Sequence, residues 1–170
     1  MSRRVAFGCL LATMLLAGCG QGLAPRADTR TRNLLAPSDV ARVAAGTPER
    51  AVLSWWRDVQ FANLTGFAAV RDAGAAATPA EEQALARLSA LAEPARPRIE
   101  GARRSGADLV VVRAVLEVLQ PVGSAEVVTA RLPFEFPMRR TAARWTIAGG
   151  LGFARGLERA LRPLSGGNQG

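Results

Sequence analysis

Histidine and tyrosine are absent from the 170 residues, and cysteine occurs only twice, at Cys9 and Cys19. Without histidine the chain cannot build a Ser-His catalytic triad, and it lacks the commonest metal ligand. The run Gly149-Gly150-Leu151-Gly152 has neither the glycine spacing nor the following βαβ unit of a dinucleotide fingerprint. These absences favour a protein with no metal, no cofactor and no catalytic residues.

Lysine is also absent, so all 22 basic residues are arginines, and the formal net charge is +8. Acidic residues are interspersed among them, as in Arg57–Asp58 and Glu158–Arg159, and the densest basic cluster, at 96–104, has no interleaved aromatic residues. Nucleic-acid binding needs a continuous basic stripe. We therefore expect no nucleic-acid partner, and a solvated basic surface that is compatible with anionic lipid head groups.

Residues 1–18 have the organisation of a signal peptide. Two arginines near the start precede an uncharged, mostly apolar run of 13 residues at 5–17, which is shorter than the about 20 apolar residues that a membrane-spanning helix needs. Leu16-Ala17-Gly18-Cys19 then resembles the lipobox of bacterial lipoproteins. The resemblance implies cleavage between Gly18 and Cys19 and attachment of a diacylglyceryl group to the Cys19 thiol. An ordinary secretory leader with an incidental cysteine is the alternative.

Lipidation at Cys19 would determine where the protein lies. Loss of Cys9 with the leader leaves no thiol in the mature chain, so zinc binding through cysteine is excluded too. Two acyl chains hold a protein durably on a bilayer. We expect a lipid-anchored protein of the cell membrane or outer membrane that faces outside the cytoplasm.

Residues 19–46 are predicted to be the lipidated cysteine and a flexible tether. This segment is rich in Gly, Ala, Pro and Arg and has no sustained periodicity. A flexible chain of this length has an average reach of about 25–30 Å. The part at 33–43 contains four apolar residues that would allow it to dock on the domain: Leu34, Leu35, Val40 and Val43.

Helices are predicted first in a domain that spans residues 47–162. Thr47-Pro48-Glu49 suits the start of a helix that ends near Asn63, and its apolar stripe consists of Val52, Trp55, Trp56 and Val59. A short helix over 64–70 is compatible with the sequence. Thr78-Pro79-Ala80-Glu81 forms a capping box for a further helix, which Pro94 ends.

Strands follow the helices. The segment at 108–119 has the strongest alternation, since Val110, Val112, Ala114, Leu116 and Val118 give it one fully apolar face. Other strands are predicted at 98–104, 125–136 and 143–148, with a turn at 139–142, a final helix at 153–161 and a disordered tail at 163–170. Helices followed by strands favour the α+β class, with helices on one face of an antiparallel sheet of four or more strands.

The element order resembles the nuclear-transport-factor-2-like superfamily, which includes ketosteroid isomerases and many bacterial lipoproteins of unknown role. Two stretches carry the resemblance, Thr47–Trp56 in the first helix and Arg144-Trp145-Thr146-Ile147 in the last strand. The resemblance implies a curved sheet wrapped around helices as a cone, with an apolar pocket at its open end. It also implies that dimers form through the sheet, so a homodimer is expected.

Catalysis of the ketosteroid-isomerase type is not expected, because the tyrosine of that site is missing. An alternative is a small hydrolase or isomerase of epoxide-hydrolase-like type that works through carboxylates and arginine. Two strands carry such residues at equal spacing, Arg113 and Glu117 on one and Arg131 and Glu135 on the next. Cross-strand ion pairing is the structural explanation of the same pattern.

A non-catalytic binding module is the interpretation that we favour. Its ligand would be a small apolar molecule in a pocket lined by Trp55, Trp56, Phe134 and Trp145. Helical spacing also favours core packing for at least one member of the Trp55–Trp56 pair. An envelope protein that docks on the sheet is the other partner compatible with the sequence.

Overall fold

The computed structural model describes residues 33–63, 78–142 and 144–165. The leader, Cys19, the predicted helix at 64–70 and the last five residues lie outside these ranges. The described chain forms helices and then a sheet, closed by a last helix, in the order α1 (Pro37–Ala41), α2 (Pro48–Gln60), α4 (Pro79–Ala92), β1 (Ala95–Arg104), β2 (Leu109–Val122), β3 (Ala125–Thr141), β4 (Arg144–Ile147) and α5 (Gly150–Ser165). The protein therefore belongs to the α+β class.

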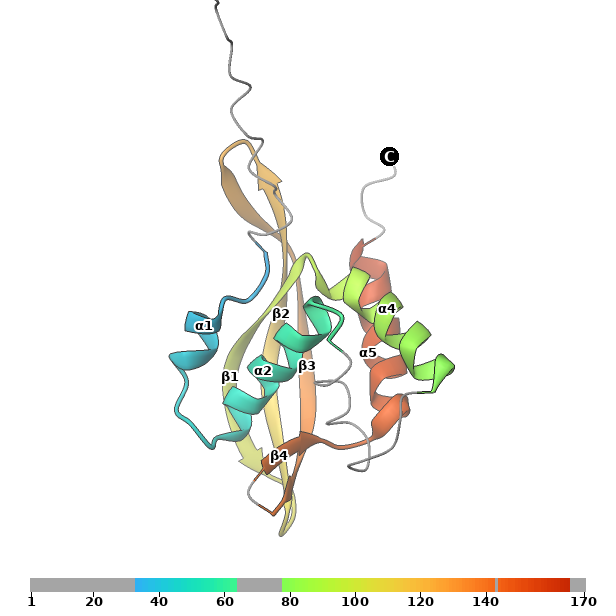
Figure 1. Cartoon of the computed structure of the whole chain (residues 1–170). Helices are drawn as coiled ribbons and strands as arrows, with labels where there is room; N and C mark the ends of the chain where they lie inside the picture. The colour runs from blue at the N-terminus through green and yellow to red at the C-terminus, as the bar shows by residue number, and fades with distance from the viewer. Residues whose placement is uncertain (1–32, 64–77, 143, 166–170) are drawn as a thin grey trace, which may run out of the picture.

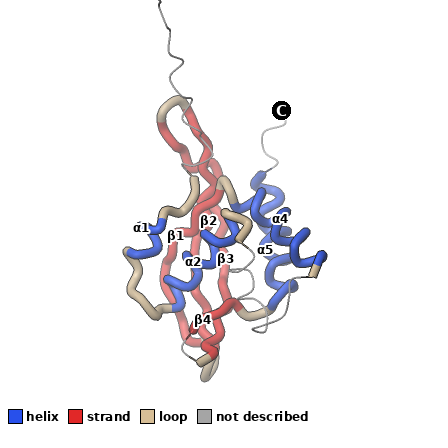
Figure 2. Tube along the Cα trace, viewed as in Figure 1, coloured by secondary structure: helices blue, strands red, loops and turns tan. Residues whose placement is uncertain are grey.

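The four strands form one antiparallel sheet in the order β1-β2-β3-β4 (Figure 2). β2 is an interior strand of 14 residues, which pairs with β3 along its length and with β1 through residues 110–118. Beyond the first residue of β1, Ala95, strands β2 and β3 continue as a projecting hairpin, whose turn contains Gly123 at a φ of 62° (Figure 1). Glycine adopts this left-handed conformation without steric cost.

The helices lie against one face of the sheet, which we call the inner face. α2 contacts β1, β2 and β4, and α4 packs on α5 beside β3 (Figure 1). The inner face of β2 presents the alternate side chains of Val112, Ala114, Leu116 and Val118, all buried as their spacing predicts. Together with the large side chains of α2, α4 and α5, they form the hydrophobic core.

The helix starts follow their local sequence signals. Thr47 accepts a hydrogen bond from the backbone N–H of Arg50, and Pro48 occupies the first turn. The Thr78 hydroxyl accepts from the N–H of Glu81, while the Glu81 carboxylate accepts from the N–H of Thr78 at 2.7 Å. This reciprocal pair is the predicted capping box, so the start of α4 is confirmed.

The segment at 33–43 packs on the domain, as its apolar residues predict. Leu35 is 5% exposed and belongs to the core. Its backbone N–H donates to Oε1 of Gln60 at 2.9 Å, and Nε2 of Gln60 donates to the carbonyls of Asn33 and Ala95. Asp39 of α1 pairs with Arg96 of β1 at 2.9 Å. The folded unit therefore includes residues that the sequence places in the tether.

The later elements are longer than the sequence indicates. β3 runs to Thr141 rather than 136, because β4 pairs with its residues 138–141 across the predicted turn. α5 covers Gly150–Ser165 rather than 153–161. Its Glu158 is buried between Arg162, at 2.6 Å, and Arg87 of α4, at 3.3 Å. This pairing joins α4 to α5 and supports a helix longer than apolar spacing alone defines.

Candidate functional site

A cavity of about 330 Å³ lies between α2 and β4, at the end of the molecule opposite the projecting hairpin (Figure 1). We call it the α2–β4 cavity. Its volume is near the lower limit of ordinary small-molecule sites, about 300–1,000 Å³. Its apolar wall consists of Ala51, Trp55, Met138, Trp145 and Ile147. These side chains come from α2, the end of β3 and β4, so the cavity exists only in the assembled fold.

The two tryptophans of the wall are held in different ways. Trp55 is 4% exposed and packs edge-on against Trp56, Phe136 and Phe153, with ring centroids 5.6–6.4 Å apart. Trp145 is half-buried, and its indole Nε1 donates to the carbonyl of Gly46 at 3.1 Å. The hydrogen bond fixes the indole of Trp145 against the loop that precedes α2.

Polar groups of α2 and β4 complete the lining. Arg50, Ser54 and Asp58 follow one another at intervals of four residues along α2, which places them on one side of the helix. Arg50 donates from one guanidinium nitrogen to the carbonyl of Val43 at 3.2 Å, and Asp58 accepts from Asn63 at 3.0 Å. Arg144 is exposed at the start of β4. The described wall thus carries two cations and one carboxylate.

Trp56 and Phe134, the other two residues predicted to form a pocket, do not line this cavity. Trp56 is fully buried, and its Nε1 donates to the carbonyl of Ala95 at 3.0 Å. Phe134 lies half-buried on the inner face, 5.2 Å from the ring of Phe136. The structure therefore brings Trp55 and Trp145 together at one cavity and places Trp56 in the core.

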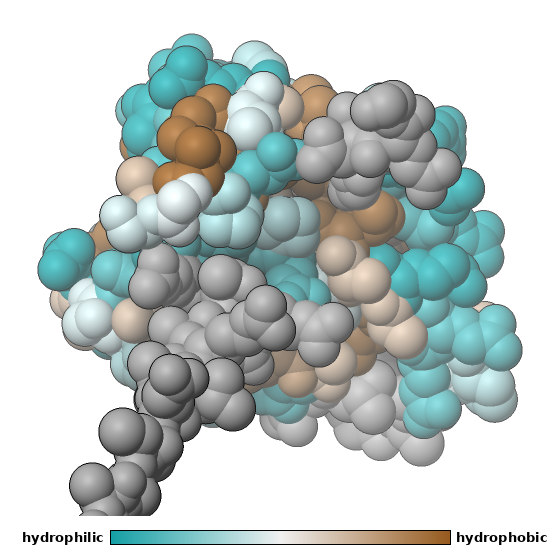
Figure 3. Space-filling view, turned by 90° about the horizontal axis from the view of Figure 1, so that it is seen from above, coloured by the Kyte–Doolittle hydropathy of each residue, from teal (hydrophilic) through white to brown (hydrophobic). Residues whose placement is uncertain are grey.

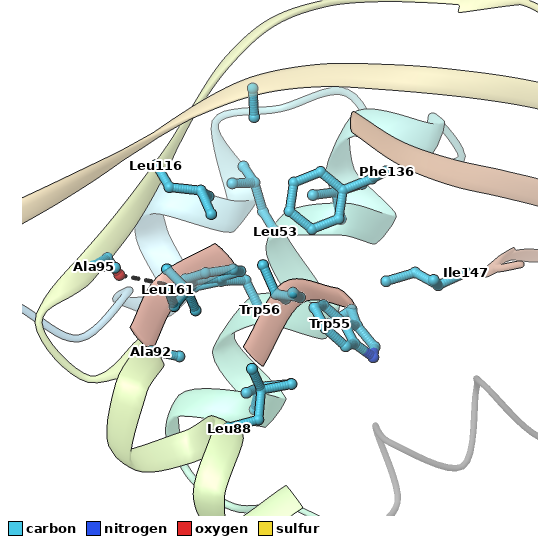
Figure 4. Close-up of a cluster of buried hydrophobic side chains, with 14 of the residues drawn as sticks. Leu53, Trp55, Trp56, Leu88, Ala92, Ala95, Leu116, Phe136, Ile147 and Leu161 are labelled. Carbon is cyan, nitrogen blue, oxygen red and sulfur yellow. Dashed lines mark hydrogen bonds between the residues drawn. The ribbon is translucent and has the colours of Figure 1, made fainter. Parts of the chain in front are cut away.

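The adjacent tryptophans of α2 differ in their hydrogen bonding. Figure 4 shows Trp56 turned toward Ala95, whereas the indole nitrogen of Trp55 points away from Leu116 and Phe136. Nε1 of Trp55 is buried, and none of the described residues accepts a hydrogen bond from it. A buried donor without a partner costs about 1–3 kcal/mol. Packing of the ring must therefore outweigh this cost.

A second cavity of about 270 Å³ lies on the other side of Trp145. It is strongly basic, because its lining combines Glu49 with three arginines, Arg103, Arg104 and Arg140. The guanidinium of Arg140 lies 5.8 Å from the centre of the Trp145 ring, within the range of a cation–π contact. Trp145 thus separates two cavities at an end of the molecule where arginines gather.

The arginines and glutamates predicted as a carboxylate site lie on the opposite, outer face of the sheet. Arg131 pairs with Glu117 at 3.2 Å, and Glu117 also pairs with Arg98 at 3.4 Å. Glu135 forms an ion pair with Arg103 at 3.5 Å. Arg113 is exposed on the same face, opposite Glu135 in the strand register. These contacts are cross-strand ion pairs, which contribute little at an exposed surface.

Among the described residues, no three Asp, Glu, His or Cys side chains gather as metal ligands. None of the helices in these ranges has the length and apolar content that a membrane crossing requires. The large apolar side chains exposed there are Phe61, Val122 and Val127. In the view from above, apolar residues form separate patches between hydrophilic ones (Figure 3).

Sequence reasoning identified two aromatic residues of the cavity and missed its polar ones. The spacing of Arg50, Ser54 and Asp58 was a usable signal, because i, i+4, i+8 places them beside Trp55 on α2. Arg144 could have been found from its position next to Trp145. Met138 carried no signal, because it fell just before a predicted turn.

Comparisons with known proteins do not place the chain in a family. No family model and no curated protein sequence matches it. A solved structure of a SEC-C motif containing protein from Rhodopseudomonas palustris aligns with a TM-score of 0.41 and 16% identity, over 65% of this chain and 83% of that one. A protein of unknown function from Mycobacterium tuberculosis aligns with a TM-score of 0.42 and 11% identity, over 69% and 88%.

Proposed function

We propose that the protein is a lipid-anchored, extracytoplasmic binding module that holds a small apolar ligand in the α2–β4 cavity and does not catalyse a reaction. The observation that carries the proposal is the composition of the cavity wall. Trp55, Trp145, Met138 and Ile147 supply apolar surface, and a few polar groups stand beside them. Small-molecule sites have this composition, in which apolar surface gives affinity and a few polar groups fix orientation.

The leader sequence supports the anchor, and the position of Asn33 relates the anchor to the fold. Nδ2 of Asn33 donates to the carbonyl of Leu119 at 3.4 Å, at the base of the projecting hairpin. The 14 residues from Gly20 to Asn33 span at most about 46–50 Å. A chain lipidated at Cys19 would therefore keep Asn33, and with it the base of the hairpin, within this distance of the bilayer.

A nuclear-transport-factor-2-like architecture is part of the proposal. In that architecture, the sheet forms a cone around α2 and the cavity lies at the open end. The position of α2 against the inner face supports this view, as does the cavity between α2 and the short last strand. The homodimer and the docking of an envelope protein are proposed for the outer face of the sheet, where Val111 and Val115 lie between arginine residues.

Binding is favoured over carboxylate-dependent hydrolysis by the placement of the acidic residues. A hydrolase of the epoxide-hydrolase-like type needs two carboxylates that converge on one water molecule. Asp58 is the one carboxylate in the described wall of the cavity. Glu117 and Glu135 are engaged by arginines on the other face of the sheet.

Native mass spectrometry of the protein from its own host tests the binding module. We expect a bound small molecule that is lost on denaturation, together with a mass that contains the acyl groups and lacks residues 1–18. Dimer peaks would support the homodimer. A chain with its first methionine and no acyl groups would contradict the anchor, and a chain that never carries a ligand would contradict the binding function.

A further inference from the structure

We infer that the ligand of the α2–β4 cavity is a small apolar monocarboxylate, with its carboxylate held by Arg50 and Arg144 and its apolar part against Trp55 and Trp145. The inference rests on the proposed binding function and specifies the chemical class of the ligand. It depends on how charge is distributed along the cavity wall.

The positive groups of the wall are not neutralised by the ion pairs found among the described residues. Those pairs involve neither Arg50 nor Arg144. Arg50 directs one guanidinium nitrogen to the carbonyl of Val43, and its remaining N–H groups can serve an anion. Arg144 stands at the exposed start of β4, directly before Trp145. The two cations therefore border the apolar wall from different elements.

The one carboxylate of the wall lies at a distance from Arg50. Asp58 follows Arg50 by eight residues, which is about 12 Å along a helix axis. Its carboxylate accepts a hydrogen bond from Asn63, beyond the end of α2. The wall is thus positive at the N-terminal end of α2 and negative toward the C-terminal end. A ligand with one negative charge fits this gradient, because Asp58 would repel a second one.

The surroundings reinforce the positive end. Across Trp145, the second cavity adds Arg104 and Arg140 against the carboxylate of Glu49, while its third arginine, Arg103, is paired with Glu135. A cleft lined by one sign of charge attracts ligands of the opposite sign over several ångströms. Arginine is also suited to a carboxylate, because its planar guanidinium can donate two parallel hydrogen bonds. The volume of about 330 Å³ accommodates an apolar part such as a ring or a short branched chain.

The three tryptophans provide a specific measurement. The chain contains only Trp55, Trp56 and Trp145, so its NMR spectrum has three indole N–H signals. Trp55 and Trp145 line the α2–β4 cavity, whereas Trp56 is buried and bonded to Ala95. Binding in the cavity should shift the first two signals and leave the third nearly unchanged. Trp56 is therefore an internal control for the place of binding.

The experiment compares two probes of the same shape that differ in charge. The full chain, purified in a neutral maltoside detergent, is titrated with 4-phenylbutyrate and separately with the uncharged 4-phenylbutanamide. We expect the acid to bind about tenfold more tightly than the amide, the effect of one good charge-assisted contact. Arg144→Gln and Arg50→Gln should each remove about this factor for the acid and leave the affinity for the amide unchanged.

A matched control and the opposing outcomes complete the design. Arg155→Gln removes the same charge from an exposed position of α5 and should change neither affinity. Arg144→Lys keeps the charge and should retain part of the preference, which separates loss of binding from loss of folding. Equal affinity for acid and amide would overturn the carboxylate inference while the binding function stands. Absence of shifts at Trp55 and Trp145 with both probes would overturn both.

Discussion

The two faces of β2 carry similar apolar side chains in different surroundings. On the inner face, Val112 and Leu116 are fully buried beneath helices. On the outer face, Val111 and Val115 are 8% and 7% exposed, although no described helix covers them. Their cross-strand neighbours explain this, because Val111 lies between Arg103 and Pro137 and Val115 between Arg98 and Pro133. Burial can thus come from arginine stems and prolines on the same sheet.

The two faces therefore differ in what their side chains contact. Side chains of the inner face pack on helices and leave the α2–β4 cavity at one end. On the outer face, Glu117 and Glu135 pair with arginines across the strands. Four experiments with six substitutions test this difference, from the core to the exposed surface.

Leu116→Ala should have the largest effect on stability. Leu116 is fully buried in the core, and large-to-small changes at such positions cost about 2–5 kcal/mol. Val115→Ala, one residue away on the outer face, should cost about 1 kcal/mol, because its neighbours are long side chains that can close over the gap. Urea unfolding followed by circular dichroism measures both. Equal losses would remove the distinction between the faces.

Gln60→Ala should have the second largest effect and lower the free energy of unfolding by about 2–3 kcal/mol. This buried side chain bonds the backbone of Leu35 and the carbonyls of Asn33 and Ala95. Its removal leaves buried backbone groups without partners. Hydrogen exchange should then become faster at Leu35 than elsewhere on the domain. Unchanged exchange at 33–43 would show that this segment is held by apolar packing alone.

Substitutions of the adjacent tryptophans Trp55 and Trp56 should have the next largest effects, and the two effects should differ. Trp56→Phe removes the bond to Ala95 and should cost about 1–2 kcal/mol. Trp55→Phe removes a buried N–H that has no partner among the described residues and should be neutral within about 1 kcal/mol. The difference between the two unfolding free energies is the quantity of interest. A larger cost for Trp55→Phe would mean that its Nε1 has a partner in the native protein.

Glu117→Gln should have the smallest effect, below about 1 kcal/mol and reduced further by salt. Glu117 pairs with Arg98 and Arg131, both more than half exposed. Exposed ion pairs contribute little because water and salt screen them. Unfolding at low and high sodium chloride concentrations measures the change. A loss that salt does not reduce would indicate that the outer face is covered in the native assembly.

Local signals predicted the local features of the fold. Capping at Thr47 and at Thr78 with Glu81 involves residues three apart, and alternation along β2 reflects one strand, so a short window of sequence contains the information. The extension of β3 to Thr141 depends on pairing with β4. The length of α5 depends on its packing against α4. Such contacts join residues distant in sequence, and no local pattern encodes them.

The candidate site, like the fold, was predictable from the sequence only where it depends on local patterns. Trp55 and Trp56 both fit the apolar stripe of α2, because positions three and four residues apart share one helix face. The placement of β4 makes Trp55 a wall residue, while Trp56 is fully buried and bonded to Ala95 at the start of β1. Trp145 was identifiable as an aromatic residue of a late strand. The charges of Arg50 and Arg144 indicate a binding site only when α2 and β4 are placed beside each other in the fold.

Closing the cavity provides the most direct test of the account. Ser54 is a partly buried residue of the wall on the solvent side of α2, so Ser54→Phe should fill the α2–β4 cavity without disturbing the core. Native mass spectra of the wild type and of this variant, purified from the same host, give the result. The account predicts that the wild type carries a bound molecule and that the folded variant lacks it. A folded Ser54→Phe protein that carries the same ligand would contradict it.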